Sequence, residues 1–461
     1  MSAGTAIARL LKKRVLGQNL VRRNPFYYDR ARQLLERVDT LDFEQRRAWS
    51  REQLALTLQQ ARRTEYGRSV RGADDISGWP LLEKECLRHG LQSFISGMDW
   101  MSAPATSGGT TGVPLKLVRS LESIVFEQAC IDRVTGLVGT KAREARTAVL
   151  RGDNPRDIVL DPQPPCEIIT SGRIMTFSAN AVTHISVEHI ADSLEKFAPQ
   201  LLCAYPSALE TLCRYLAESG RKLRIPSVVT SSEVFKPAAW KLAVEVLGCR
   251  LADYYGQAER IAFAIATEPN AYYFQPAYSW VEFVPYDGQI LPRHDEHRLY
   301  EIVGTSFWNN VLPIVRYRTG DLIRLPREWG VRELRELALG LRPFDGVLGR
   351  QQEIIVCPNS VRLTGLSTLP SEVCNVLRIQ VVQEDFEQLR IFVLPTPGFS
   401  KADAETLLAN ARTRVPAEMN VSVEIVPRLE RTPRGKTPLI VHRPLVHDAL
   451  RRQGVEPLFT R

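Results

Sequence analysis

The feature that most constrains the fold is an alternation of short apolar runs with longer amphipathic ones. It begins at Leu201 and continues to Tyr254. The expected strands and helices are, in order, residues 201–206, 207–217, 227–231, 236–247 and 250–254. A repeated strand–helix–strand pattern is typical of parallel strands, because the helix carries the chain back to the end where the next strand starts. We therefore predict an α/β domain with a largely parallel sheet covered by helices.

Polar and small residues follow two of these predicted strands. Ser231, Ser232 and Glu233 end one strand, and Tyr255 and Gly256 end the next. Ligands of parallel sheets bind at the carboxyl ends of the strands. These five residues therefore predict a ligand-binding edge.

The length of the chain requires more than one hydrophobic core. A chain of 461 residues is expected to divide into two or three domains. Residues 272–323 carry short β-rich runs typical of an antiparallel, barrel-like subdomain, and the tail has the pattern of a small α+β domain. Helical spacing recurs over residues 29–63, 121–139 and 401–414. We predict an N-terminal core over residues 1–349, a hinge at 350–353 and a C-terminal domain over 354–461.

Composition narrows the functional classes. No apolar run approaches the ~20 residues that span a bilayer, and the chain start lacks the apolar core of a secretory signal, so we expect a cytoplasmic protein. The net charge of +8 suits anionic ligands. The sequence lacks the interleaved basic and aromatic pattern typical of nucleic-acid binding, so we do not expect a nucleic-acid partner. The basic segment 6–23 could rest on an acidic membrane, but a solvated helix packed on the main domain is favoured.

A loop rich in glycine and hydroxyl side chains, ATSGGTTGVP, occupies residues 105–114. Glycines let the backbone fold closely around an anion and expose its N–H groups, and the hydroxyls add further donors. No Lys follows Gly112, so this is not the common Lys-containing phosphate loop. The loop suits a polyphosphate, and a flexible surface linker is the alternative. The expected phosphate contacts are Ser107, Gly108, Gly109, Thr110, Thr111 and Gly112.

Four further motifs follow this loop. They are DYYGQAE at 253–259, RYRTGD at 316–321, GRQQE at 349–353 and TPRGKT at 432–437. In this order the five motifs resemble the adenylate-forming superfamily of acyl-CoA synthetases and ligases. The branch indicated is that of the phenylacetate–CoA ligases, with its capsular-polysaccharide-biosynthesis members. The matching segments run from about residue 66 to 440.

The resemblance implies an AMP-forming acid–thiol ligase with two half-reactions. A small carboxylic acid attacks the α-phosphate of ATP, with Mg²⁺, and forms an acyl-adenylate and pyrophosphate. A thiol then displaces AMP; it belongs to coenzyme A or to the phosphopantetheine of an acyl carrier protein.

The resemblance also implies roles for residues that match its motifs. Glu259 is expected to hold Mg²⁺, and one carboxylate suffices because phosphate oxygens and waters complete the coordination. Tyr255 and Gly256 would flank the adenine, Asp321 would accept hydrogen bonds from the ribose, and Arg350 would contact ribose or phosphate. The remaining expected nucleotide contacts are Ser232, Glu233 and Gln257.

Lys436 is the expected catalytic cation. In the family, a Lys of a Gly-Lys turn on a mobile C-terminal domain bridges the carboxylate and the α-phosphate, and a flexible point charge suits that role. A solvated lysine is the alternative. The candidates for contact with the acid are Tyr205, Ser231, Phe235 and Ala262. Aromatic and small side chains suit a planar or short apolar acid, although Tyr205 could equally belong to the core.

Three positions depart from the family pattern. Ala258 stands where many relatives have Thr, Gln352 where the hinge usually has Asp or Lys, and Val113 where a Lys is common. Two alternatives therefore stay open. One is a ligase that uses an amine or hydroxyl acceptor in polysaccharide or secondary-metabolite biosynthesis. The other is a non-catalytic nucleotide-binding relative.

Overall fold

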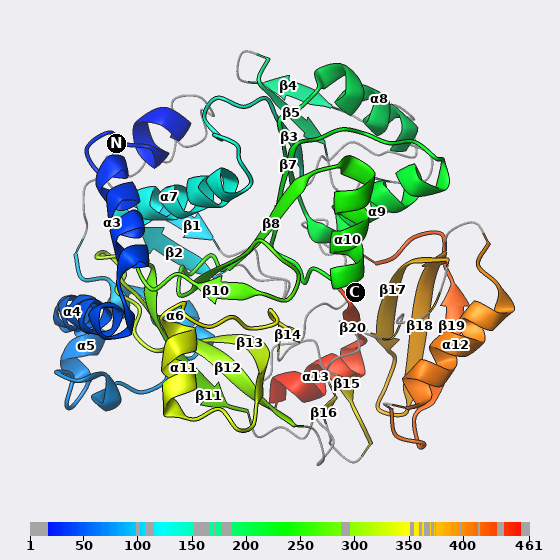
Figure 1. Ribbon diagram of the computed structural model, residues 1–461. Coiled ribbons are helices and arrows are strands. Elements are labelled where there is room, and N and C mark those ends of the chain that lie inside the picture. The colour runs from blue at the N-terminus through cyan, green and yellow to red at the C-terminus, as the bar shows by residue number, and fades with distance from the viewer. Residues whose placement is uncertain are drawn as a thin grey trace.

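The computed structural model forms a large sheet with helices on both faces, an antiparallel sheet beside it and a third sheet near the C-terminus (Figure 1). It describes residues 17–97, 102–106, 115–151, 166–169, 172–177, 182, 187–286, 296–350, 355–358, 362–363, 369, 373, 375–395, 398–413, 415–430 and 438–452. Within these ranges, no helix combines the length and the apolar character needed to cross a bilayer.

The large sheet has eight strands in the order β10-β9-β8-β7-β6-β3-β5-β4. Its strands are β3 (Thr147–Leu150), β4 (Glu167–Ile169), β5 (Ile174–Phe177), β6 (Leu201–Ala204), β7 (Ser227–Ser231), β8 (Arg250–Gly256), β9 (Phe263–Ala266) and β10 (Tyr272–Phe274). Strands β5, β3, β6, β7 and β8 run parallel, and antiparallel pairs complete both edges. The predicted parallel sheet is thus confirmed.

Helices cover both faces of this sheet (Figure 1). One face carries α8 (Val187–Phe197), α9 (Pro206–Glu218) and α10 (Pro237–Leu247); the other carries α3 (Tyr28–Thr40) and α7 (Leu121–Leu137). Helices α9 and α10 both begin with proline, whose missing N–H costs no hydrogen bond in a first turn. The helices predicted over 29–63 are confirmed as α3 and α4 (Phe43–Ala61).

The second sheet is antiparallel and has the order β11-β12-β13-β14. Its strands are β11 (Ser279–Pro285), β12 (His297–Ser306), β13 (Tyr317–Pro326) and β14 (Gly349–Arg350). Helix α11 (Val331–Ala338) lies between β13 and β14 in the chain. The antiparallel prediction is confirmed for β11–β13, and in the described residues the ladder runs from β11 to β14 without closing. Strand β10, which the sequence groups with these strands, instead forms a hairpin with β9 in the large sheet.

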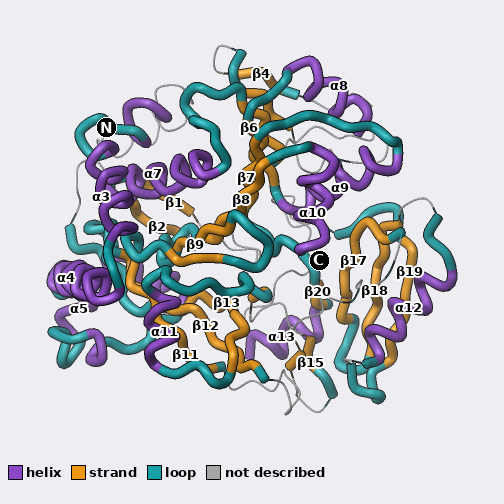
Figure 2. Tube along the Cα trace, in the orientation of Figure 1, coloured by secondary structure: helices purple, strands orange, loops and turns teal. Residues whose placement is uncertain are grey.

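The C-terminal part has a hydrophobic core of its own under a sheet with the order β19-β18-β17-β20 (Figure 2). Its elements are β15 (Ile355–Val356), β16 (Arg362–Leu363), β17 (Val376–Gln383), β18 (Gln388–Pro395), α12 (Lys401–Arg412), β19 (Asn420–Ile425), β20 (Ile440–His442) and α13 (Pro444–Arg452). The predicted α+β composition of the small C-terminal domain is confirmed. The remaining short elements are η1 (Gly17–Arg22), α5 (Glu65–Ser69), η2 (Ile76–Gly78), α6 (Lys84–Gly90), η3 (Leu91–Phe94), β1 (Ala103–Thr106) and β2 (Lys116–Arg119).

A buried carboxylate of the large sheet accepts hydrogen bonds from side chains of two other strands, β7 and β10. Asp253 of β8 is only 3% exposed. It accepts hydrogen bonds from the hydroxyls of Thr230 (2.6 Å) and Tyr272 (2.5 Å). Burial raises the pKa of Asp253 to about 6, although both hydrogen bonds oppose that rise. Because the carboxylate form is disfavoured inside the fold, Asp253 lowers stability at neutral pH.

We expect Asp253→Asn to stabilise the protein at pH 7.5 relative to the parent, with a smaller effect at pH 4.5. The folded pKa of about 6 lies above the ordinary value of 3.8, so the stability contributed by Asp253 is present below pH 4 and is lost as the pH rises through 6. A shift of about two units corresponds to about 3 kcal/mol. The asparagine keeps an acceptor for Thr230 and gains a donor toward Tyr272.

Urea unfolding of parent and variant at both pH values measures this difference. The exposed Asp74→Asn, which removes an ion-pair partner of Arg62 at the surface, is the control. A stability difference between Asp253→Asn and the parent that does not change with pH would contradict the assignment.

Candidate active site

The predicted nucleotide motif starts in β8 and continues in the loop before β9. Gln257 holds this loop, because its Oε1 accepts a hydrogen bond from the backbone N–H of Ala262 at 3.1 Å and its Nε2 donates to the hydroxyl of Tyr255. Gly256 lies between them and pairs with Phe263 of β9. Gln257 thus sets the path of the loop, and Glu259 lies on that loop.

A partly buried hydrogen bond joins the two sheets. The hydroxyl of Tyr255 donates to Oδ2 of Asp321 at 2.7 Å, and Asp321 of β13 is 3% exposed. Burial and the neighbouring Asp321 raise the pKa of Tyr255 well above its usual value, so the hydroxyl keeps its proton and donates. The backbone of Asp321 pairs with Arg350 across β13 and β14. Three of the predicted nucleotide residues, from three motifs, therefore meet at one place.

A second contact between the same motifs involves Glu259. The hydroxyl of Tyr317, a residue 3% exposed, donates to Oε1 of Glu259 at 3.2 Å. The other carboxylate oxygen of Glu259 accepts no hydrogen bond from the described residues. A single carboxylate with one oxygen available fits Mg²⁺ that is otherwise held by phosphate oxygens and waters. In the described ranges, no group of three or more metal-ligating side chains is present.

Two ion pairs fix Tyr317 from either side. Arg316 contacts the carboxylate of Glu282 at 3.0 and 3.2 Å, and Arg318 contacts Glu301 at 2.5 and 2.8 Å. Both arginines of the RYRTGD motif are therefore engaged in ion pairs within the fold. The sequence predicted the motif as part of the site but gave Tyr317 no role. The alternation of inward and outward side chains along a strand does not reveal which residues they contact.

Left-handed backbone conformations occur beside these motifs. Ser232, Arg260 and Arg316 have φ values of 76°, 59° and 50°, although none is glycine. Ser232 follows β7, Arg260 follows Glu259 and Arg316 precedes Tyr317. Such conformations cost of order 1–3 kcal/mol each and persist where surrounding contacts fix them, which is frequent at functional sites.

Two of the predicted contacts to the acid, Tyr205 and Ser231, lie at the carboxyl ends of β6 and β7. The hydroxyls of Ser231 and Ser232 are 3.1 Å apart. Tyr205 lies partly buried beside them, with the guanidinium of Arg151 5.8 Å from its ring centroid. Glu233 accepts a hydrogen bond from the backbone N–H of Ser207 at 3.0 Å, which satisfies a free donor in the first turn of α9. Glu233 therefore already serves the fold.

The other two candidates for contact with the acid are core residues. Phe235 is 7% exposed and packs against Trp240 with ring centroids 5.3 Å apart. Ala262 is completely buried in the same core. The structure brings Tyr205, Ser231 and Ser232 to one edge of the sheet, whereas Phe235 and Ala262 pack beneath it.

Several predicted residues lie outside the described residues: Ser107, Gly108, Gly109, Thr110, Thr111, Gly112, Val113, Gln352 and Lys436. The strands that flank the first group are described. Strands β1 and β2 pair antiparallel with Thr106 opposite Lys116, so the two ends of the phosphate-loop segment are adjacent.

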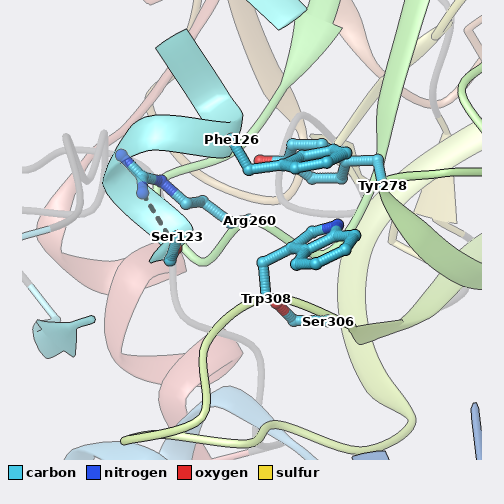
Figure 3. A pocket seen from close by; sticks show the side chains of 6 residues that line it. All are labelled: Ser123, Phe126, Arg260, Tyr278, Ser306 and Trp308. Carbon is cyan, nitrogen blue, oxygen red and sulfur yellow. Dashed lines mark hydrogen bonds between the residues drawn. The ribbon is translucent and has the colours of Figure 1, made fainter. Parts of the chain in front are cut away.

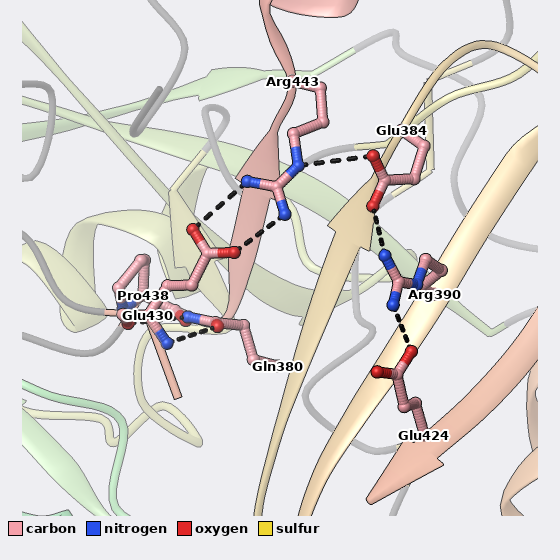
Figure 4. Close-up of polar contacts among 7 residues, drawn as sticks. All are labelled: Gln380, Glu384, Arg390, Glu424, Glu430, Pro438 and Arg443. Atoms are coloured by element: carbon pink, nitrogen blue, oxygen red, sulfur yellow. Dashed lines mark hydrogen bonds and ion pairs between the residues drawn. The ribbon is translucent and has the colours of Figure 1, made fainter. Parts of the chain in front are cut away.

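The two ends of the segment that carries Lys436 are also held together. The buried Gln380 of β17 donates through Nε2 to the carbonyls of Glu430 and Pro438, both at 2.9 Å, and accepts from the N–H of Glu430 (Figure 4). Arg443 adds a bidentate ion pair to Glu430 at 2.8 and 3.2 Å. Sequence reasoning missed Gln380, since a glutamine in an apolar strand carries no signal of its partner.

Comparison with known proteins supports the class that the fold and the motifs indicate. The CapK C-terminal domain family matches residues 358–443. Protein CapK of Staphylococcus aureus is 22% identical over 54% of each chain, and phenylacetate-coenzyme A ligase of Escherichia coli K12 is 26% identical over 66% of each. The matches thus span about half to two thirds of these relatives.

Solved structures share the fold. A 2-hydroxyisobutyryl-CoA ligase in complex with 2-HIB-AMP, in the postadenylation state, superimposes with a TM-score of 0.57 at 14% identity, covering 87% of this chain and 90% of the other. The resemblance carried by the five motifs is confirmed: the chain is a homologue of CapK and the phenylacetate–coenzyme A ligases and has the α/β fold of adenylate-forming ligases.

We expect Tyr255→Phe to lower the free energy of unfolding by about 1–3 kcal/mol, because it removes a hydrogen bond to a buried carboxylate. Thermal and urea unfolding measure the loss. Tyr273→Phe removes the same hydroxyl from a ring on β10 that is 41% exposed and is expected to change stability by less than about 0.5 kcal/mol. Equal effects of the two substitutions would show that the Tyr255–Asp321 bond contributes nothing particular to stability.

Proposed function

We propose that this protein activates a carboxylic acid with ATP as an acyl-adenylate and transfers the acyl group to a thiol of coenzyme A or of a carrier-protein phosphopantetheine. The observation that carries the proposal is the pair of contacts Tyr255–Asp321 and Tyr317–Glu259. They gather two nucleotide motifs at the carboxyl end of a parallel sheet, where ligands bind. Homology to phenylacetate–coenzyme A ligases supports the same reaction class.

In this proposal, residues of four motifs hold the nucleotide. Asp321 and Arg350 bind the ribose, and the Tyr255 ring packs against the adenine while its hydroxyl stays bonded to Asp321. Glu259 holds Mg²⁺, which neutralises phosphate charge when bound. The phosphate loop also holds the nucleotide, and its proposed contacts are Ser107, Gly108, Gly109, Thr110, Thr111 and Gly112. Ser232, Glu233 and Gln257 support the nucleotide from the neighbouring turns.

The proposed first step joins two anions, so it depends on positioning and charge neutralisation. An oxygen of the acid bonds to the α-phosphorus, and the bond to pyrophosphate breaks. Lys436 bridges the carboxylate and the α-phosphate. In the second step the thiol sulfur attacks the acyl carbon and AMP leaves. Tyr205 and Ser231 are the proposed contacts to the acid, with Phe235 and Ala262 behind them.

The proposed division of the chain assigns nucleotide and acid binding to residues 1–349, a hinge to 350–353 and delivery of Lys436 to 354–461. The separate hydrophobic core of the C-terminal part supports this division. A contact between Arg378 and Glu233 at 3.9 Å joins that part to the ligand-binding edge. ATP and coenzyme A as substrates place the proposed reaction in the cytoplasm.

We expect Glu259→Gln to reduce acid-dependent pyrophosphate release by about 100-fold or more at millimolar Mg²⁺, because it removes the charge that holds the metal. A panel of aromatic and short apolar acids, assayed with Mg·ATP, identifies the acid and measures the loss. Glu268→Gln changes an exposed carboxylate nine residues further along the chain and is expected to act as the parent does. A Glu259→Gln variant with parental activity would show that the Mg²⁺ assignment is wrong, and the absence of turnover with every acid would favour the non-catalytic alternative.

We expect Lys436→Ala to block adenylation but to leave thioester formation from a chemically prepared acyl-adenylate largely intact. A contact made only in the first transition state lowers the rate of that step with little change in substrate binding. Lys401→Ala, a lysine 91% exposed in the same part of the chain, serves as the control. Rapid-quench assays of each half-reaction provide the measurement.

Equal loss of both half-reactions would indicate a structural role for Lys436, and retained adenylation would refute the catalytic assignment. Supplying an amine or a hydroxyl compound in place of the thiol in the second assay separates the thiol ligase from the alternative acceptors.

A further inference from the structure

Two arginines bracket Glu259. Nη2 of Arg119, the last residue of β2, donates to the carbonyl of Ala258 at 2.7 Å. Arg260, the residue after Glu259, is 8% exposed and donates through Nη1 to the hydroxyl of Ser123 in α7 at 2.8 Å (Figure 3). The backbone before Glu259 is thus bonded to β2, and the side chain of the residue after Glu259 is bonded to α7.

The Arg260 side chain is enclosed where it meets α7. Its Nε lies 3.8 Å from the carboxylate of Glu127, which also accepts a hydrogen bond from the hydroxyl of Tyr278. Figure 3 shows Arg260 reaching toward Ser123 beside a group of aromatic rings. Phe126 and Trp308 stack in this group at 4.2 Å between ring centroids. Arg260 therefore has little freedom to move away from α7.

The backbone of Arg260 is consistent with an anchor. Its φ of 59° is left-handed, which an arginine adopts only where contacts impose it. This conformation turns the chain sharply after Glu259, so that the Arg260 side chain reaches α7 while the Glu259 carboxylate meets Tyr317 of β13.

The arrangement also carries an electrostatic cost. Burial, and then the nearby positive charge of Arg260, lower the pKa of Arg119 to about 10. The negative charges of Glu127 and Glu259 oppose this fall in the pKa of Arg119, and Glu127 also opposes the lowering of the pKa of Arg22 by burial. Buried charged groups of this kind often stabilise a fold less than apolar residues would. A role other than stability accounts better for two arginines at this place.

We propose that Arg260 and Arg119 are positioning residues that fix the Glu259 carboxylate relative to β2 and α7. The inference rests on the proposed function. Strand β2 leaves the 107–114 segment, and its last residue binds the carbonyl that precedes Glu259. Strand β2 and the backbone just before Glu259 are thereby tied to each other before any ligand arrives, which lowers the cost of ordering Glu259 on binding.

Binding of a non-hydrolysable ATP analogue, measured by calorimetry with and without Mg²⁺, tests this role. In the parent, Mg²⁺ is expected to increase the affinity for the analogue. In Arg260→Leu this increase is expected to be about 10-fold smaller, while the affinity without Mg²⁺ stays as in the parent. Adding it to Glu259→Gln is expected to weaken binding no further, because residues that act through one another are not additive. Arg119→Leu should behave in the same way, and Arg119→Lys should restore part of the gain, since lysine keeps a donor for the Ala258 carbonyl.

Arg46→Leu is the matched control. Arg46 is also 8% exposed and donates to backbone carbonyls, including that of Leu339, in another part of the core. It is expected to lower stability without changing the Mg²⁺ dependence of binding. Three results would each overturn the inference. Arg260→Leu could show the same Mg²⁺ dependence of affinity as the parent, it could lose affinity equally with and without Mg²⁺, or its effect could add fully to that of Glu259→Gln.

A second measurement needs no ligand. Hydrogen exchange of the backbone amides over residues 258–262 is expected to rise at least 10-fold in Arg260→Leu and to stay parental in Arg46→Leu. Unchanged exchange in Arg260→Leu would overturn the positioning role. If the parent protein itself binds the nucleotide analogue without any Mg²⁺ dependence, the proposed function fails, and the exchange experiment alone then decides the role of Arg260.

Discussion

The hydrogen bond between Tyr255 and Asp321 joins the parallel sheet to the antiparallel sheet at the predicted nucleotide site. Its acceptor is a buried carboxylate, so it is stronger than a neutral pair and sensitive to geometry. The contact fixes the end of β8 against β13, and β14 pairs with β13 at the same residue. The neighbouring bond from Tyr317 to Glu259 depends on this alignment, since one bond joins the end of β8 to β13 and the other joins the loop after β8 to the same strand.

Charged side chains around this contact divide into two groups. Arg316 and Arg318 have carboxylate partners within 3.2 Å, and they hold β13 in place. Arg119 and Arg260 instead bind a carbonyl and a hydroxyl and share the more distant Glu127. The first group stabilises the scaffold, whereas the second has no close carboxylate of its own among the described residues and lies next to Glu259.

The C-terminal part uses polar groups in a different way. Gln380 is completely buried in β17, and its amide satisfies three backbone groups of Glu430 and Pro438. A buried amide is stable only when its donors and acceptors are satisfied. These bonds join two stretches of chain that flank residues 431–437, and Arg443 reinforces one of them through Glu430. The base of that segment is therefore part of the core of the C-terminal sheet.

The periodicity of the sequence determined β6 to β8 with their crossover helices, because apolar spacing reports burial directly and the loops between them are short. It misplaced β10 and gave no sign of β17 or α11, since short apolar runs suit several partners equally well. The order of the motifs indicated the family resemblance, and with it the proposed class of chemistry and the candidate residues Tyr255, Glu259 and Asp321. Only the tertiary structure decided which hydroxyl meets which carboxylate, as with Tyr317 and Glu259, 58 residues apart. Such pairs form through packing between distant segments, and no local pattern in the chain encodes the partner.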